Sequence, residues 1–332
     1  MGHLHKSFDR RNFLRATAGT TVALAAASVT GASAATAAAT PTAAAPTAAT
    51  PGKLSIPKDR IGIQLFSIRD KVSAFGFAVV LAELSRIGYR EIEFAGYTQS
   101  TSILGRQITL PEIRRLLDDN GLRAVGSHVG IGSLRTSLQA ELDAAQILGM
   151  PHIGTANAPT NTNTVAGYLA AAEEFNAWGE AATARGLKLY QHNHAGEFAF
   201  AEDQPSVRLY DVFLRNTDPR HVYLELDVFW AYVGQYRWPG FDPAAYVRDQ
   251  PYRYPLFHMK DGDSNPAQAN GFDIVEFGAG DLPYEKFVRD ISPRAAHIGI
   301  WEQDTAPGAL PDPPGSLGAA ERSYTALKGL LG

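Results

Sequence analysis

The sequence predicts a single (β/α)8 barrel, and two observations carry this prediction. From residue 60 onward, short apolar runs alternate with amphipathic stretches over about 270 residues, near the usual size of such a barrel. The first predicted strand leads into Ser67-Ile68-Arg69-Asp70, without the glycine-rich phosphate turn that a doubly wound open sheet usually carries. We therefore favour the barrel over the open sheet, with no internal repeat and no second domain.

Each strand is predicted from a short apolar run, and each helix from apolar residues at helical spacing. Gly88, Gly149 and Gly186 each end a helix, and Pro111 lies in the first turn of another. The predicted strands cover residues 61–68, 91–95, 124–129, 152–156, 187–194, 222–229, 255–260 and 298–303. The predicted helices cover residues 77–87, 110–120, 134–148, 165–185, 207–215, 243–247, 284–290 and 317–331.

Composition excludes several classes of protein. A formal net charge of -4 gives the surface no bulk attraction for nucleic acid or for an anionic membrane. The chain has no cysteine, so disulfide scaffolds, thiolate metal sites and cysteine nucleophiles are excluded. Any metal ligands must therefore be His, Asp or Glu side chains.

The N-terminus has the features of an export signal. Residues 9–15, DRRNFLR, resemble a twin-arginine motif, and residues 16–52 carry no charged side chain. We expect a twin-arginine signal peptide over 1–34, an Ala/Thr/Pro-rich linker over 35–59 and the barrel over 60–332. This organisation predicts a periplasmic or extracellular protein without stable membrane insertion after cleavage. A retained membrane anchor is the alternative.

Polar side chains gather where the late strands end, on the face of a barrel that carries active sites. Strand five ends with His192 and His194, strand six with Asp227, and strand seven with His258. Glu302 lies at the end of strand eight. Because side chains alternate with period 2, these imidazoles and carboxylates can converge. Such a set without sulfur suits Mn²⁺, Mg²⁺, Zn²⁺, Co²⁺ or Fe²⁺ and does not select among them.

Other residues at the same face are candidates for substrate contact or proton transfer: Glu93, His128, Glu197, Trp230 and Lys260. Simpler interpretations remain for several residues. Asp227 could form a salt bridge with a barrel Lys or Arg, and His258 could be a hydrogen-bonded core residue. Asp304 is interpreted as a solvated loop acid. His152 and His297 start strands, so we interpret them as structural.

Eight phrases, in this order, resemble the xylose-isomerase-like sugar phosphate isomerase/epimerase family. They are GIQLFSIRD (62–70), EFAGY (93–97), GSH (126–128), HNHAGEF (192–198), LDVFW (226–230), FHMKDGD (257–263), EFGAG (276–280) and EQD (302–304). The resemblance covers residues 60–331 and implies the barrel fold. It is specific for the superfamily and does not select one reaction within it.

Sugar epimerases of this family hold one divalent ion with Glu, Asp, His and Glu, which follow strands five to eight. The resemblance carries the last three ligands onto Asp227, His258 and Glu302. At the first position this sequence has His192, with His194 as the competing choice. In those epimerases two glutamates exchange protons with the substrate, so the missing glutamate puts two-base epimerisation in doubt. The histidines of strand five resemble the dehydratase and lyase branches more closely.

The resemblance implies a divalent-metal-dependent isomerase or epimerase that acts on a sugar or keto-sugar through an enediolate. Glu302 would be the base, with Lys260 or His194 as the second group. A metal-dependent dehydratase or lyase acting on a keto-glycoside or cyclitol is one alternative, and a non-catalytic secreted sugar-binding barrel is another. A DNA-repair role would need a basic groove, and the net charge argues against it. The expected partner is a small carbohydrate and not nucleic acid, and homo-oligomerisation stays open.

Overall fold

The structure, a computed structural model, describes residues 56–291 and 294–331 of the 332-residue chain. The predicted signal peptide (1–34) and most of the predicted linker (35–59) lie outside the described residues. Within the described part, none of the helices combines the length and the apolar character needed to cross a membrane.

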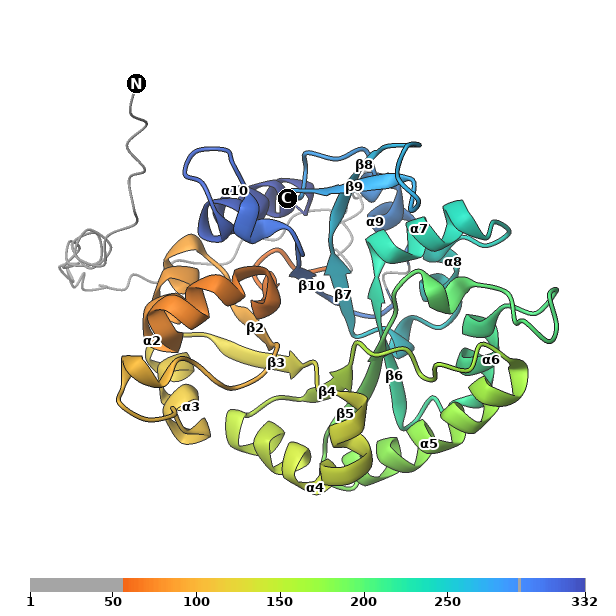
Figure 1. The fold of residues 1–332 in the computed structure, drawn as a ribbon, viewed down its shortest axis with the longest axis horizontal. Helices are drawn as coiled ribbons and strands as arrows, with labels where there is room; N and C mark the ends of the chain where they lie inside the picture. Colours follow the sequence, from red (N-terminus) through yellow and green to blue (C-terminus); the bar gives the residue numbers. More distant parts are fainter. Residues whose placement is uncertain (1–55, 292–293, 332) are drawn as a thin grey trace, which may run out of the picture. The chain divides into compact units, whose positions relative to one another are not determined.

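Eight parallel strands form the barrel, in the spatial order β3-β2-β1-β10-β7-β6-β5-β4 (Figure 1). Their bounds are β1 Gly62–Gln64, β2 Glu91–Phe94, β3 Arg123–Ser127, β4 His152–Thr155, β5 Lys188–His192, β6 Val222–Asp227, β7 Leu256–Met259 and β10 Ile298–Trp301. At the two ends of this order, β3 and β4 meet through a parallel bridge between His128 and Gly154. The predicted (β/α)8 barrel is confirmed, with a nearly closed sheet.

Helices connect the strands and lie outside them. Their bounds are α2 Arg69–Ile87, α3 Leu110–Asp119, α4 Ile131–Leu148, α5 Val165–Thr183, α6 Leu209–Asn216, α7 Val228–Arg237, α8 Pro243–Asp249, α9 Tyr284–Asp290 and α10 Ser316–Leu330. Short 3-10 turns cover Leu65–Ile68, Thr101–Ile103, Gly196–Phe198, Pro251–Arg253 and Ala306–Gly308. Local sequence explains the helix ends: Thr109 and Glu112 form a capping box on α3, and Gly149 ends α4 at a left-handed φ of 71°.

Three elements differ from the sequence prediction. The first strand ends at Gln64, because the next residues form a 3-10 turn instead of continuing as a strand. Helix α7 follows β6 directly, where the prediction continued the strand to residue 229 and placed no further helix before residue 243. An antiparallel hairpin of β8 (Asp261–Ser264) and β9 (Phe272–Val275) follows β7 and was not predicted. All three changes lie at the carboxyl ends of the strands, where they shape the polar cluster described next.

The barrel interior changes from apolar to polar along the strands. Tyr190, Leu256 and Ile300 belong to one buried apolar cluster. Two residues further along the same three strands come His192, His258 and Glu302, which share a face with these apolar residues because the side-chain period of a strand is 2. The polar cluster therefore rests on an apolar floor at the carboxyl end of the barrel.

Candidate metal centre at the carboxyl ends of the strands

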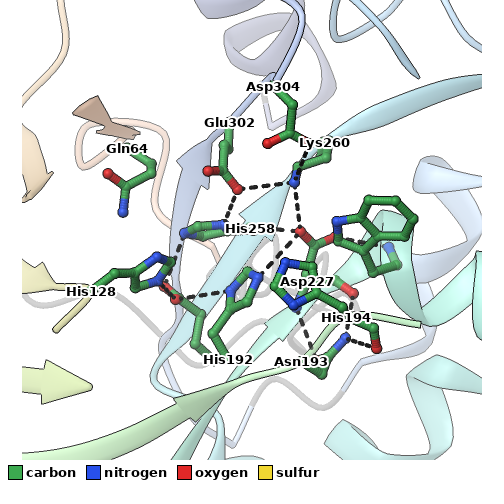
Figure 2. Close-up of polar contacts among 12 residues, drawn as sticks. Gln64, His128, His192, Asn193, His194, Asp227, His258, Lys260, Glu302 and Asp304 are labelled. Atoms are coloured by element: carbon green, nitrogen blue, oxygen red, sulfur yellow. Dashed lines mark hydrogen bonds and ion pairs between the residues drawn. The ribbon is translucent and has the colours of Figure 1, made fainter. Parts of the chain in front are cut away.

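Four buried side chains from β5, β6, β7 and the end of β10 converge on one point. We call His192, Asp227, His258 and Glu302 the outer group; one donor atom from each lies within 4.8 Å of the other three (Figure 2). His258 Nδ1 lies 2.8 Å from Glu302 Oε2, and His192 Nε2 lies 3.7 Å from Asp227 Oδ2. Strand pairing explains part of this geometry, because Asp227 and His258 are register partners in β6 and β7.

The two carboxylate oxygens of Asp227 have different environments. Oδ1 accepts a hydrogen bond from Trp230 N at 2.9 Å and caps α7, whereas Oδ2 is buried without a hydrogen-bond partner. Burial raises the pKa of Asp227 to about 6, and the charge of Lys260 opposes that rise. A buried carboxylate oxygen without a hydrogen bond, close to imidazoles and a second carboxylate, belongs to a donor set that fits a divalent cation.

A carboxylate below the outer group orients His258. Glu93 Oε2 lies 2.6 Å from His258 Nε2, and Glu93 also accepts hydrogen bonds from Gln64 Nε2 and the Tyr190 hydroxyl. This arrangement turns Nδ1 of His258 toward the outer group, as carboxylate partners do for metal-binding histidines. The substrate contact predicted for Glu93 would require this fully buried network to open.

His192 is oriented in the same way by Glu225. Its Nδ1 lies 3.2 Å from Glu225 Oε2, so Nε2 is directed toward Asp227. Burial, together with the charges of His258 and other neighbours, lowers the pKa of His192 well below its usual value. A neutral imidazole is the form that binds a metal. By position, the structure brings His192, rather than His194, into the outer group.

A second set of possible ligands lies deeper in the barrel. This inner group consists of His128, His192, Glu225 and His258. It shares the imidazoles of His192 and His258 with the outer group but would use the other nitrogen of each ring. A neutral imidazole has only one nitrogen with a free lone pair, so each ring can serve only one of the two groups at a time. Partly exposed side chains that a substrate can reach, including Asp304 at 34%, adjoin the outer group. Access to substrate therefore favours the outer group.

Lys260 places a buried ammonium beside this cluster. Nζ lies 3.2 Å from Asp227 Oδ2, 3.0 Å from Glu302 Oε2 and 3.1 Å from Asp304 Oδ2. Burial opposes its charge, but the three carboxylates raise the pKa of Lys260 above its usual value. Asp304, interpreted as a solvated loop acid, is partly solvated with 34% of its side chain exposed, and its carboxylate also accepts a hydrogen bond from this ammonium.

The other residues predicted to act on substrate are spread around the outer group. His194 is half-buried, and burial followed by the charge of Lys260 lowers its pKa to about 4, so the ring is neutral at pH 7. Trp230 faces both residues, with its ring centroid 5.8 Å from that of His194 and 5.5 Å from Lys260 Nζ. Its Nε1 is buried without a hydrogen-bond partner and is thus free to donate to a ligand.

Two predicted substrate contacts are occupied by protein partners. Glu197 is buried, and its Oε2 accepts a hydrogen bond from His194 N at 3.0 Å; burial raises its pKa to about 7. His128 Nε2 lies 2.8 Å from Glu225 Oε2, and 13% of the His128 side chain is exposed. In this structure Glu197 fixes the end of β5, and His128 extends the network of the inner group.

Sequence reasoning missed the residue that joins the two most important strands. Asn193 Oδ1 accepts a hydrogen bond from Asp227 N, and Asn193 Nδ2 donates to Asp227 O, each at 3.2 Å. Asn193 thus links the end of β5 to the end of β6 on the face opposite the two histidines that flank it. The sequence offered one signal: an asparagine lies between two candidate site histidines at a strand end, and its amide needs hydrogen-bond partners if it is buried.

Fold and site together define a barrel protein with a buried His/carboxylate cluster, able to hold a metal, at the carboxyl ends of its strands. The chain belongs to the Xylose isomerase-like TIM barrel family, which matches residues 81–314 and so more than half of its length. A search of curated proteins finds no match.

Solved structures share the fold at low sequence identity. A sugar phosphate isomerase/epimerase from Parabacteroides distasonis is 23% identical, with a TM-score of 0.62 over 86% of this chain and 96% of that one. A probable 3-DHS dehydratase, AsbF, from Bacillus anthracis is 12% identical, with a TM-score of 0.59 over 81% and 98%. The IOLI protein, which carries a zinc atom, is 12% identical, with a TM-score of 0.62 over 82% and 98%. At these identities the similarity shows the fold alone.

Proposed function

We propose that the protein is a divalent-metal-dependent isomerase or epimerase that acts on a sugar or keto-sugar through an enediolate. The observation that carries this proposal is the outer group, in which Oδ2 of Asp227 makes no hydrogen bond and lies near two imidazoles, beside the ammonium of Lys260. His192, Asp227, His258 and Glu302 would hold the ion. When bound, the cation would supply Lewis-acid stabilisation for the charge that develops on the enediolate.

The side chains around the outer group supply the remaining chemistry. Burial opposes ionisation of Glu302, but Lys260 and His258 lower its pKa well below the usual value, so the carboxylate is ionised. Glu302 would be the base that takes the α-proton. The neutral ring of His194 is the second proton-transfer group. Lys260 keeps its proton and acts by charge. Trp230 offers a wall for a sugar ring, together with a free indole N–H.

Elimination is the second candidate reaction, and one observation favours it. In the epimerases that this sequence resembles, a metal-binding glutamate lies at the end of strand five. This chain has His192 at that position. The second carboxylate needed for two-base exchange is therefore missing, while a neutral His194 and a charged Lys260 are in place to assist a departing oxygen. A keto-glycoside or cyclitol would suit this reaction, which yields an unsaturated product instead of a stereoisomer.

The first test measures metal content and proton exchange on the purified protein. We expect one divalent ion per chain, and incorporation of solvent deuterium next to the carbonyl of a keto-sugar. Asp227→Ala should lose the metal, whereas Asp218→Ala, which removes a partly exposed carboxylate paired with Arg220 outside the outer group, should keep it. Unchanged metal content in Asp227→Ala would reject the ligand assignment. Bound metal without exchange into any keto-sugar would favour a sugar-binding barrel.

We further propose that the protein works outside the cytoplasm, on free sugars, oxidised glycosides or cyclitols. This proposal rests on the arginine pair and the uncharged stretch at residues 16–52. Replacing both arginines, Arg10 and Arg11, with lysine should retain the protein in the cytoplasmic fraction of an expressing bacterium. An unchanged distribution between cell fractions would reject export by this route.

A further inference from the structure

Lys260 holds its ammonium against the two carboxylates that we assign to the metal. Nζ lies 3.2 Å from Asp227 Oδ2 and 3.0 Å from Glu302 Oε2, and only 1% of the lysine side chain is exposed. Two cations on the same oxygens repel each other strongly in a buried site, because charge repulsion there is only weakly screened. The ammonium and a divalent ion therefore compete for Asp227 and Glu302.

Asp304 offers the ammonium a partner outside the outer group. Its Oδ2 accepts a hydrogen bond from Lys260 Nζ at 3.1 Å. Asp304 lies toward the open side of the cluster, with 34% of its side chain exposed, and Figure 2 shows Lys260 between it and Asp227. The lysine can therefore leave the two ligand oxygens while it keeps its hydrogen bond.

We propose that Lys260 is the resident counter-cation of the outer group, that a divalent ion displaces its ammonium, and that Asp304 then holds the ammonium beside the substrate. This proposal rests on the proposed function, because it needs the outer group to bind metal. It gives Lys260 two measurable effects: the side chain stabilises the metal-free fold and weakens metal binding. Asp304 has the opposite effect on metal binding, because it favours the displaced position.

The first experiment titrates Mn²⁺ or Zn²⁺ into the metal-free chain and measures the metal Kd by calorimetry. Lys260→Met removes the competing charge and should tighten the metal Kd by at least about tenfold, given the strength of a unit charge at this spacing. The same variant should melt at a lower temperature than wild type without metal. Lys286→Met is the matched control, since its ammonium pairs with Asp290 on α9. It should leave the metal Kd unchanged.

The second experiment uses Asp304, which lies outside the outer group. Asp304→Asn removes the charge that attracts the displaced ammonium, and we expect a metal Kd weaker by about three- to tenfold. In the Lys260→Met background, the same substitution should weaken the Kd clearly less, because only the direct attraction between Asp304 and the ion remains. An equal loss of affinity in both backgrounds would overturn the coupling.

The outcomes separate this inference from the function on which it rests. Equal metal Kd values for wild type and Lys260→Met overturn the inference and leave the metal site intact. Absence of metal binding in every variant rejects the proposed function itself. If Lys260→Met does not fold, Asp304→Asn and a metal-loaded crystal structure decide the question. An ammonium still between Asp227 and Glu302 with the ion bound would overturn the inference.

Discussion

Asp227 and Trp230 are joined by a hydrogen bond of 2.9 Å from the Trp230 amide to Asp227 Oδ1, which begins helix α7 at the point where β6 ends. One carboxylate oxygen is thereby used by the fold and the other is left for the site. The cap fixes the rotation of the Asp227 carboxylate. The change from strand to helix at this residue therefore also sets the direction of a candidate metal ligand.

Substitutions at Asp227 should separate these two roles. Asparagine caps helices about as well as aspartate, so Asp227→Asn should keep α7 but bind metal at least about 100-fold more weakly. Asp227→Ala should lose both, with a metal-free unfolding free energy about 1 kcal/mol lower than that of Asp227→Asn. Urea unfolding and metal titration measure the two effects. Equal stability of the two variants would show that the cap contributes nothing.

Glu93 should affect the metal through His258, without touching it. Glu93→Gln weakens the contact that directs Nδ1 of His258 toward the outer group, and such carboxylate partners are worth about 10- to 100-fold in metal affinity. Chelator competition measures this change. Glu91→Gln is a matched control on the same strand, because Glu91 is equally buried and pairs with Arg60 and Arg123. If both variants lower the affinity equally, damage to β2 is the explanation.

His152 should make the fold sensitive to acid. Its Nδ1 donates to the Val125 carbonyl at 2.9 Å; burial lowers its pKa from 6.5 to about 4, although that hydrogen bond opposes the shift. Between these two pH values the unfolded chain binds a proton that the native chain does not. The contribution of His152 is therefore complete above pH 6.5 and is lost as the pH falls toward 4, by up to about 3 kcal/mol.

The test compares urea unfolding of wild type and His152→Asn between pH 4 and pH 7. The variant should show a flatter pH dependence in this window, with little difference in slope above pH 7. Identical slopes in the two proteins would mean that another group causes the acid sensitivity. The result would also test the interpretation of His152 as a structural residue at the start of β4.

Much of this architecture could be predicted from local patterns. The alternation of strands and helices predicts the barrel, and period 2 within β5, β6 and β7 indicates which polar residues point inward. The hairpin of β8 and β9 could not be predicted this way, because its short strands depend on pairing with each other and on packing of Phe272 and Ile274 against a cluster that includes Phe229.

The sequence predicts the site only where a residue's position along its own strand decides its place. The convergence of Asp227, His258 and Glu302 follows from their places at strand ends. The roles of Glu93 and Asn193 do not, because each depends on a partner from another strand, and Glu93 and His258 are 165 residues apart in the sequence. Orientation within a buried network depends on the whole set of neighbours, which no single segment of sequence contains.

Trp230 should contribute to substrate binding and not to metal binding. Its ring faces His194 and Lys260, and its buried Nε1 has no hydrogen-bond partner. Trp230→Ala removes a stacking surface and a donor, so KM for a reactive keto-sugar should rise about five- to tenfold. The metal Kd should stay within about twofold of wild type, because the backbone amide that caps α7 is retained.

A second tryptophan from the same apolar cluster provides the control. Trp238 packs against the cluster formed by Ala195, Phe229 and Val233, as Trp230 does, but its ring contacts Arg237 and not the outer group. Trp238→Ala should lower stability and leave KM unchanged. Similar KM values for wild type and Trp230→Ala would remove Trp230 from the substrate site. A similar rise in KM in both variants would mean that the rise comes from loosening of α7 and not from a lost substrate contact, because the two tryptophans share their packing but not their position beside the outer group.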